Sequence, residues 1–145
     1  MPMKLLLLLA FGATCFNTGL IWIIQLVHYP GFLKIGREGY DAYQAFHMRS
    51  ISWIVGPSML IEAISTGLLL FYLKELPLTA LFYCSLFLLL TIWVNTAFFA
   101  VPAHNKLLSG YNVEAINNLV NVNWWRTFAW TARSILLGMI LYKLL

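Results

Sequence analysis

The sequence predicts an all-α integral membrane protein that crosses the bilayer as a four-helix bundle. Of the 145 residues, 61% are hydrophobic and 10% are charged, whereas an average soluble domain has about 25% charged residues. Four apolar stretches each approach the ~20 residues that a helix needs to cross the hydrocarbon core. Backbone groups in lipid must be satisfied within the segment, which favours helices. The predicted spans cover residues 5–28, 51–73, 79–101 and 125–144 of a single domain, 1–145.

The first stretch resembles a signal peptide at its start, because Lys4 precedes a run of leucines. Its apolar character continues as far as Val27, beyond the 7–15 residues of a typical signal core. We therefore expect an uncleaved first span. Cys15 and Cys84 fall inside apolar segments without a partner pattern, so they are predicted to be small buried hydrophobic residues.

The connection at residues 74–78 is so short that the second and third spans must be antiparallel neighbours. The other two connections are longer, and each is predicted to hold a short interfacial helix. In residues 37–49, Tyr40, Tyr43, Phe46 and His47 form an amphipathic stripe, so this segment either lies at the interface or extends the second span. Residues 111–122 are rich in asparagine and are predicted to form a short helix of their own.

The net charge of +4 comes from lysines and arginines spread along the chain. Nucleic-acid binding is excluded, because it would need a basic patch on one surface. More positive residues fall on the side of the two long loops, which favours a cytoplasmic location for those loops and a bacterial inner membrane. On the long-loop side these are Lys34, Arg37, Arg49, Lys106 and Arg126, against Lys4, Lys74 and Lys143 on the other.

Polar residues recur on one face of each predicted span, and they should face the bundle interior because lipid penalises them. In chain order the faces hold Thr14, Asn17, Gln25 and His28; Ser58, Glu62 and Ser65; Thr91 and Asn95; and Arg126, Trp130 and Arg133. Glu62 lies about 16 Å deep at 1.5 Å per residue and is the only acid inside a span. A buried arginine needs a partner, so Glu62 and Arg133 are predicted to form a buried ion pair.

The long-loop half of the bundle is the predicted functional half, because all three histidines lie at that end. His28, His104 and Arg126 are the candidate catalytic residues, with a histidine as general base and the arginine stabilising negative charge. The candidate substrate-binding residues are Gln25, Tyr29, Asn95, Asn105 and Trp130.

Three cofactor hypotheses stay open. His28, His47 and His104 are candidate ligands of a transition metal, although Glu62 is too far along its helix from His47 to share one ion. Haem bound through His28 or His104 is a second hypothesis. A site with no bound cofactor is favoured over both. His47 can alternatively cap a helix at the interface, and Trp53, Trp124 and Trp125 fit an interfacial aromatic belt.

Three short motifs resemble the small four-span membrane proteins related to anthrone oxygenases, a family mostly of unknown function. They are His28-Tyr29-Pro30, then Pro102 to Leu107 with His104-Asn105, and finally Trp124-Trp125-Arg126-Thr127 with Arg133 further on. Family members often have Thr-Asn after the third-span proline and a histidine before the Arg-Thr pair, and this chain departs from both patterns. The resemblance implies oxidation of a hydrophobic, quinone-like or polycyclic substrate without an obvious bound cofactor.

The sequence leaves three functions open. The first is an enzyme whose lipophilic substrate enters sideways from the lipid. The second is a small-molecule or proton-coupled transporter or binding protein, which with four spans would act as a homo-oligomer. The third is an accessory membrane subunit whose polar face holds helices together.

Overall fold

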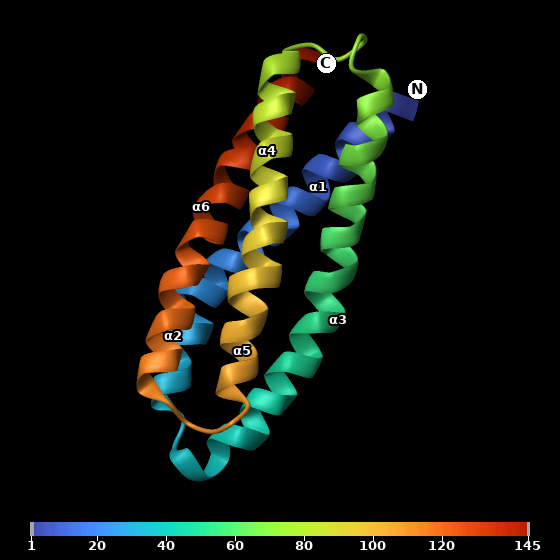
Figure 1. Ribbon diagram of the computed structural model, residues 1–145. Helices are drawn as coiled ribbons and strands as arrows, with labels where there is room; N and C mark the ends of the chain where they lie inside the picture. The colour runs from blue at the N-terminus through green and yellow to red at the C-terminus, as the bar shows by residue number, and fades with distance from the viewer. Residues whose placement is uncertain (1, 145) are drawn as a thin grey trace.

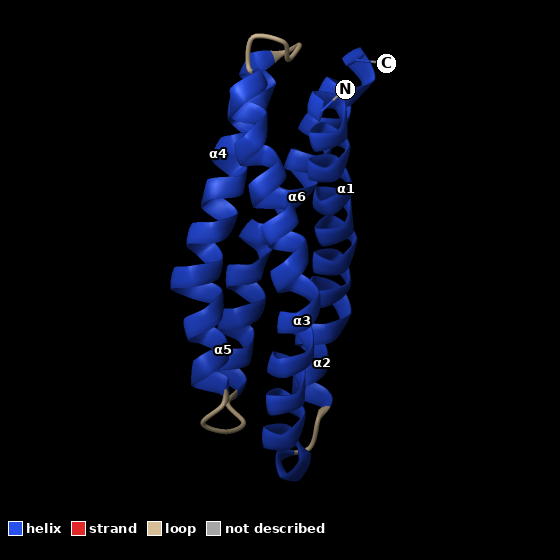
Figure 2. Cartoon of the chain, turned by 90° about the vertical axis from the view of Figure 1, so that its right-hand side faces the viewer, coloured by secondary structure: helices blue, strands red, loops and turns tan. Residues whose placement is uncertain are grey.

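The computed structural model describes residues 2–144 as four helical rods, with no strand among those residues, so the all-α prediction is confirmed for this part of the chain. The rods run side by side in alternating directions (Figures 1 and 2). They comprise α1 (Pro2–Ile23), η1 (Ile24–His28), α2 (Tyr29–Gly31) and η2 (Phe32–Lys34); α3 (Arg37–Leu69) and η3 (Leu70–Tyr72); α4 (Thr79–Asn95), η4 (Thr96–Ala100) and α5 (Val101–Leu107); and α6 (Val113–Leu144).

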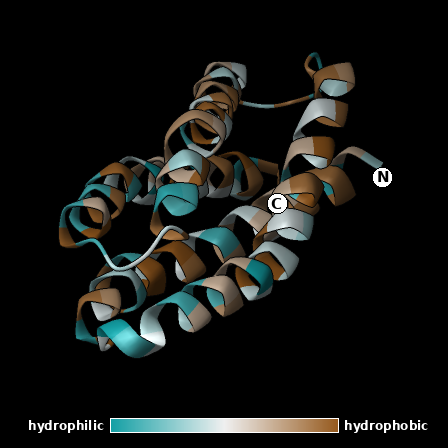
Figure 3. Ribbon diagram, turned by 60° about the horizontal axis from the view of Figure 1, so that its bottom comes forward, coloured by the Kyte–Doolittle hydropathy of each residue, from teal (hydrophilic) through white to brown (hydrophobic). Residues whose placement is uncertain are grey.

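The first three rods, Pro2–Lys34, Arg37–Tyr72 and Thr79–Leu107, are long and apolar enough to cross a membrane. This supports the predicted membrane location. Large apolar side chains cover the outside of the rods, among them Phe71 at 84% exposure and Phe98 at 71%. Figure 3 looks toward the loop end and shows hydrophobic residues over much of the ribbon, with hydrophilic residues recurring near the turns.

Two predictions are corrected by the helix positions. Residues 111–122 form no separate short helix, because Val113 onward belongs to one continuous helix, α6. The Asn112 side chain accepts a hydrogen bond from the Ala115 backbone N–H at 2.9 Å and so caps that helix at its start. Residues 37–49 extend the second rod as part of α3, which is one of the two alternatives predicted for them. Cys15 and Cys84 are exposed rather than buried, since each lies on the outer side of its helix.

Two π-helical turns, η1 and η4, interrupt the first and third rods near the loop end. The backbone N–H of Tyr29 bonds to the Ile24 carbonyl, and that of Val101 bonds to the Thr96 carbonyl, five residues back in each case. Each turn directly precedes an X-Pro pair, Tyr29-Pro30 or Val101-Pro102. A proline ring clashes with the carbonyl four residues earlier in a regular α-helix, and a wider turn relieves that clash. Single π-turns inside helices occur frequently at functional sites.

The interior divides into two apolar clusters with a polar layer between them. The cluster at the termini is built from residues such as Leu7, Phe82 and Leu137, and the cluster at the loop end includes Phe32 and Ile116. Helix α1 packs against both α3 and α6, and α4 packs against α6. The antiparallel neighbours α3 and α4 have no comparable contact with each other. This arrangement leaves space between the second and third rods.

Candidate functional site

Glu62 and Arg133 form a buried ion pair at the middle of the molecule. The Arg133 Nε donates to Glu62 Oε1 at 2.7 Å, and both side chains are fully buried. The structure therefore brings together the two residues that the sequence paired. Their positions, on α3 and α6, tie together helices that share no extensive backbone contact.

Every polar atom of this pair has a partner. Glu62 also accepts hydrogen bonds from Thr14, Asn17 and Trp130, at 2.7, 3.1 and 3.1 Å. The two Arg133 Nη atoms donate to the Ser85 carbonyl and hydroxyl and to the Thr66 hydroxyl, each at 2.6 Å. A fully satisfied buried network makes a helix arrangement more specific and rigid. The geometry therefore suits a structural role for the pair.

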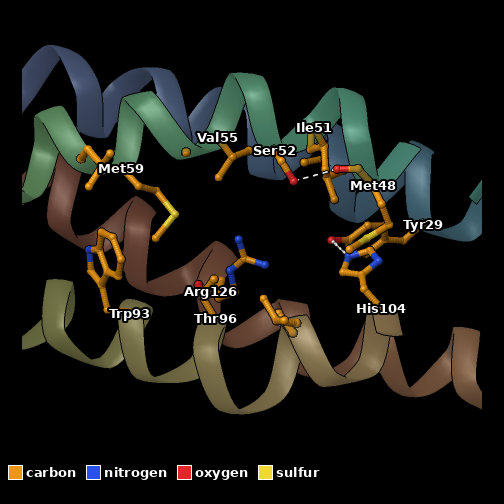
Figure 4. Close-up of a pocket in the computed structure, with 15 residues that line it drawn as sticks. Tyr29, Met48, Ile51, Ser52, Val55, Met59, Trp93, Thr96, His104 and Arg126 are labelled. Atoms are coloured by element: carbon orange, nitrogen blue, oxygen red, sulfur yellow. Dashed lines mark hydrogen bonds between the residues drawn. The ribbon is translucent and has the colours of Figure 1, made fainter. Parts of the chain in front are cut away.

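A lateral cavity of about 380 Å³ lies between α3 and the third rod, within the size range of small-molecule sites. Figure 4 shows Val55 and Met59 of α3 across the cavity from Trp93 and Thr96 of the third rod. The lining residue Leu60 is 53% exposed on the apolar outer surface. The cavity is therefore reached from the side of the molecule. Its polar lining includes Tyr29, His104 and Arg126.

Arg126 is a buried cation that lines the lateral cavity and is only 6% exposed. Its Nη1 donates to Asn123 at 3.3 Å, and its guanidinium carbon lies 5.2 Å from the centre of the Trp130 ring. The Nε atom has no hydrogen-bond partner. Within residues 2–144, the one ion pair is Glu62–Arg133, so Arg126 has no acidic partner there. Buried charges are normally paired, and this one therefore favours an anion bound in the cavity.

Tyr29 and His104 form a hydrogen-bonded pair beside this cation. The Tyr29 hydroxyl lies 2.8 Å from His104 Nε2, and the Gln44 side-chain amide nitrogen lies 3.3 Å from His104 Nδ1. When the tyrosine donates, Nε2 is the acceptor and Nδ1 carries the proton of the neutral ring. This tautomer requires the Gln44 amide to turn its oxygen, which is otherwise buried without a partner, toward Nδ1. A phenol and an imidazole joined in this way can take a proton from a bound ligand. The pair comes from α2 and α5, just after the two π-turns.

The three histidines converge at the loop end. His28 Nε2 lies 2.6 Å from His47 Nδ1, and the His47 and His104 rings are 5.3 Å apart between centroids. His47 is 3% exposed, so it is an interior residue rather than a surface helix cap. Figure 4 shows the neighbouring His104 turned toward Tyr29.

The histidines do not fit a metal in this arrangement. Among residues 2–144, no group of three His, Cys, Asp or Glu side chains is placed to hold one. Two nitrogens bound to one tetrahedral ion at ~2.1 Å would lie about 3.4 Å apart, further than the 2.6 Å between His28 and His47. The haem candidates His28 and His104 each have Nε2 bonded to another side chain.

The other predicted site residues have different places. Gln25 is buried but bonds Asn123 at 2.8 Å, so it positions the acceptor of Arg126 rather than facing the cavity. Trp130 connects Arg126 to the ion pair through its bond to Glu62.

Asn95 and Asn105 do not line the lateral cavity, so their predicted substrate-binding role gains no support from it. Asn95 lies in a shallow outer groove of about 500 Å³ beside Val94 and Trp125, and Asn105 is exposed. Asn95 lies just before the π-turn η4 and His104 lies after it, so the change of helical phase separates the two side chains.

Two site residues were missed from the sequence. Asn123 holds Arg126, and Gln44 holds His104. A partial indication was present, because Asn123 precedes Arg126 by three residues and Gln44 precedes His47 by three. Residues at this spacing are neighbours on a helix face.

Comparison with models of known protein families gives no match, and neither curated proteins nor solved structures give one. Over residues 2–144, the fold and site define a class on their own: an all-helical protein with an apolar outer surface and a lateral cavity lined by a buried cation that has no acidic partner there.

Proposed function

We propose that this chain is an integral membrane enzyme that binds a lipophilic, weakly acidic substrate in the lateral cavity. The observation that carries the proposal is Arg126, a buried guanidinium that lines an apolar cavity and has no acidic partner in the described part of the chain. A ligand that is apolar over most of its surface and carries one ionisable hydroxyl or enolisable carbonyl matches both features. Quinol-like and anthrone-like compounds have this chemistry.

In the proposed arrangement α6 is a fourth membrane span, although it is not among the helices whose length and apolar composition are sufficient to cross a membrane. Its 32 residues extend about 48 Å at 1.5 Å per residue, which exceeds the bilayer core. Arg126 and Arg133 are buried, whereas Phe128 and Ile135 are exposed. The charges that lower the hydropathy of α6 therefore face inward, and lipid would meet apolar residues. The excess of positive residues favours the loop end as the cytoplasmic side of a bacterial inner membrane.

The proposed chemistry begins with proton removal. The substrate's acidic group lies between Arg126 and the Tyr29–His104 pair, which accepts the proton while the guanidinium stabilises the anion. Loss of the proton makes an aromatic substrate electron-rich, the state from which quinols and anthrones are oxidised. The resemblance to anthrone-oxygenase-like proteins, carried by His28, Tyr29, His104 and Arg126 among others, supports oxidation as the overall reaction, with dioxygen as the co-substrate that accepts the electrons.

The Glu62–Arg133 pair, whose polar atoms all have hydrogen-bond partners, favours the enzyme hypothesis over the hypothesis of a proton-coupled carrier. A carrier's acid must exchange its proton with water, whereas Glu62 is fully buried with both carboxylate oxygens bonded. An accessory subunit would not need an unpaired cation in a ligand-sized cavity.

A spectroscopic probe tests the proposal. Alizarin is a hydroxylated anthraquinone whose neutral and anionic forms differ in visible absorbance. We expect alizarin bound to the protein in lipid nanodiscs to show the anion spectrum in an acidic buffer where the free probe is neutral. Empty nanodiscs control for partition into lipid. Bound probe that keeps the neutral spectrum, or no binding beyond that of empty nanodiscs, would contradict the proposal.

A further inference from the structure

A line of imidazole rings leads away from the lateral cavity. His104 lines the cavity, His47 is enclosed next to it, and His28 is half-buried at the far end. The rings of His28 and His47 lie 4.4 Å apart between centroids, and those of His47 and His104 lie 5.3 Å apart. Three separate elements, η1, α3 and α5, supply these three residues.

His47 is the middle ring of the three, and one of its ring nitrogens has no hydrogen-bond partner among the described residues. Nδ1 bonds to His28 at 2.6 Å, whereas the buried Nε2 has no hydrogen-bond partner among residues 2–144. A buried polar atom without a hydrogen-bond partner lowers the stability of the folded state by about 1–3 kcal/mol. A functional role for His47 Nε2 would explain why this cost is tolerated. A nitrogen that receives a proton during the reaction needs to be free between events.

The lateral cavity creates a need for such a group. If a ligand in the cavity loses a proton, as the proposed function requires, that proton cannot leave through hydrocarbon because ions are strongly disfavoured there. It therefore needs a route through protein to water.

We propose that His104, His47 and His28 form a proton relay that carries the ligand's proton from the cavity to the loop-end surface. This inference rests on the proposed function and adds two residues to it. His47 is the residue through which the relay must pass, and His28 is the exit rather than the base that touches substrate.

The relay balances as a sequence of proton transfers. The ligand O–H bond breaks and its proton goes to the Tyr29 oxygen, while the tyrosine's own proton moves to His104 Nε2. His104 then releases its Nδ1 proton to His47 Nε2, across a gap that one ring rotation or a bridging water closes. The Nδ1 proton of His47 moves to His28 Nε2, and His28 releases a proton to water. No electron is transferred.

The groups around the three histidines favour proton movement from the lateral cavity toward the loop-end surface. Among the described residues, Arg126 is the one arginine, lysine or acidic residue that lines the lateral cavity, and its charge repels a proton held on His104. The phenol of Tyr43 and the ring of Phe32 enclose His28, at 6.0 and 5.1 Å between centroids. Gln44 holds His104 from α3.

A pH-jump experiment tests the relay. Protein with bound alizarin is mixed rapidly across the midpoint at which the bound probe titrates, and the probe absorbance reports how fast it equilibrates with bulk protons. We expect His47→Gln to bind the probe as the wild type does but to equilibrate about a hundredfold more slowly, the lower end of what a positioned proton-transfer group contributes. Asp41→Asn, at an exposed position of the same helix, should equilibrate at the wild-type rate.

Chemical rescue separates a relay from a structural role. His47→Ala leaves space for a small base, so imidazole in the buffer should speed equilibration in His47→Ala and leave His47→Gln slow. If His47 variants fold poorly, His28→Gln, at the half-buried exit, should show the same slowing. Wild-type rates in His47→Gln and His28→Gln, or no response of His47→Ala to imidazole, would overturn the relay. A wild-type protein that never forms the probe anion would instead overturn the proposed function.

Discussion

Glu62→Gln is expected to lower the free energy of unfolding by about 3–5 kcal/mol, the cost of breaking a buried pair while one charge stays inside. The substitution leaves the Arg133 guanidinium, fully buried on α6, without a counter-charge in a low-dielectric interior. Arg133→Gln should cost a similar amount, because the Glu62 carboxylate is then left uncompensated. The loss should appear in detergent as a transition of the helical circular-dichroism signal at lower denaturant concentration.

The double variant makes this prediction specific. Glu62→Gln with Arg133→Gln removes both charges, so it should cost less than the sum of the single changes, by about 0.5–3 kcal/mol. Glu75→Gln is the matched control, since Glu75 is exposed in the turn between the second and third rods, and it should change stability by less than about 0.5 kcal/mol. Additive losses would show that the two residues stabilise the fold independently.

Arg126→Gln is expected to weaken ligand binding and to leave the stability of the fold intact, the reverse of the result expected for Arg133→Gln. It should weaken alizarin binding by about 10- to 150-fold, corresponding to the 1.5–3 kcal/mol of a hydrogen bond to a charged group. It should not destabilise the protein, because the native arginine is a buried charge with no acidic partner between residues 2 and 144 and its removal ends a desolvation cost. Loss of binding without loss of stability distinguishes Arg126 from Arg133.

Two further variants sharpen the role of Arg126. Arg126→Lys keeps the charge and should retain part of the affinity, with the anion spectrum of the bound probe preserved. Arg49→Gln removes a cation that is exposed on α3 and should leave the affinity unchanged within about twofold. Equal affinities for the wild type and Arg126→Gln, measured by absorbance titration, would remove the basis of the proposed site.

The sequence predicted the features that follow from the energetic cost of placing charged groups in an apolar interior or in lipid. Glu62 was paired with Arg133 because it was the one acid inside the predicted spans. The structure places Glu62 Oε1 2.7 Å from Arg133 Nε. The helical fold class and three membrane-compatible rods followed from the lengths of the apolar stretches. These predictions need only residue type and approximate depth, not the rotation of each helix.

The sequence could not predict features that depend on helix rotation and continuity. Two π-turns change the helical phase before Tyr29 and His104, and no periodicity argument anticipated them. Asn95 was accordingly assigned to the site although it faces an outer groove, and His47 was considered for a surface cap although it is buried. The cavity itself arises from the absence of close packing between α3 and α4, which no local pattern encodes.

A ligand held in the lateral cavity is the central claim, and blocking that cavity tests it most directly. Val55→Trp places a large ring where Val55 lines the cavity (Figure 4), and Val94→Trp makes the same change in the outer groove of α4. The measurement is alizarin affinity by absorbance titration in nanodiscs, with unfolding transitions to confirm that both variants fold. The lateral-cavity account predicts at least about tenfold weaker binding, or 1.4 kcal/mol, for Val55→Trp and wild-type affinity for Val94→Trp. Wild-type affinity in Val55→Trp, or the loss in Val94→Trp instead, would contradict it.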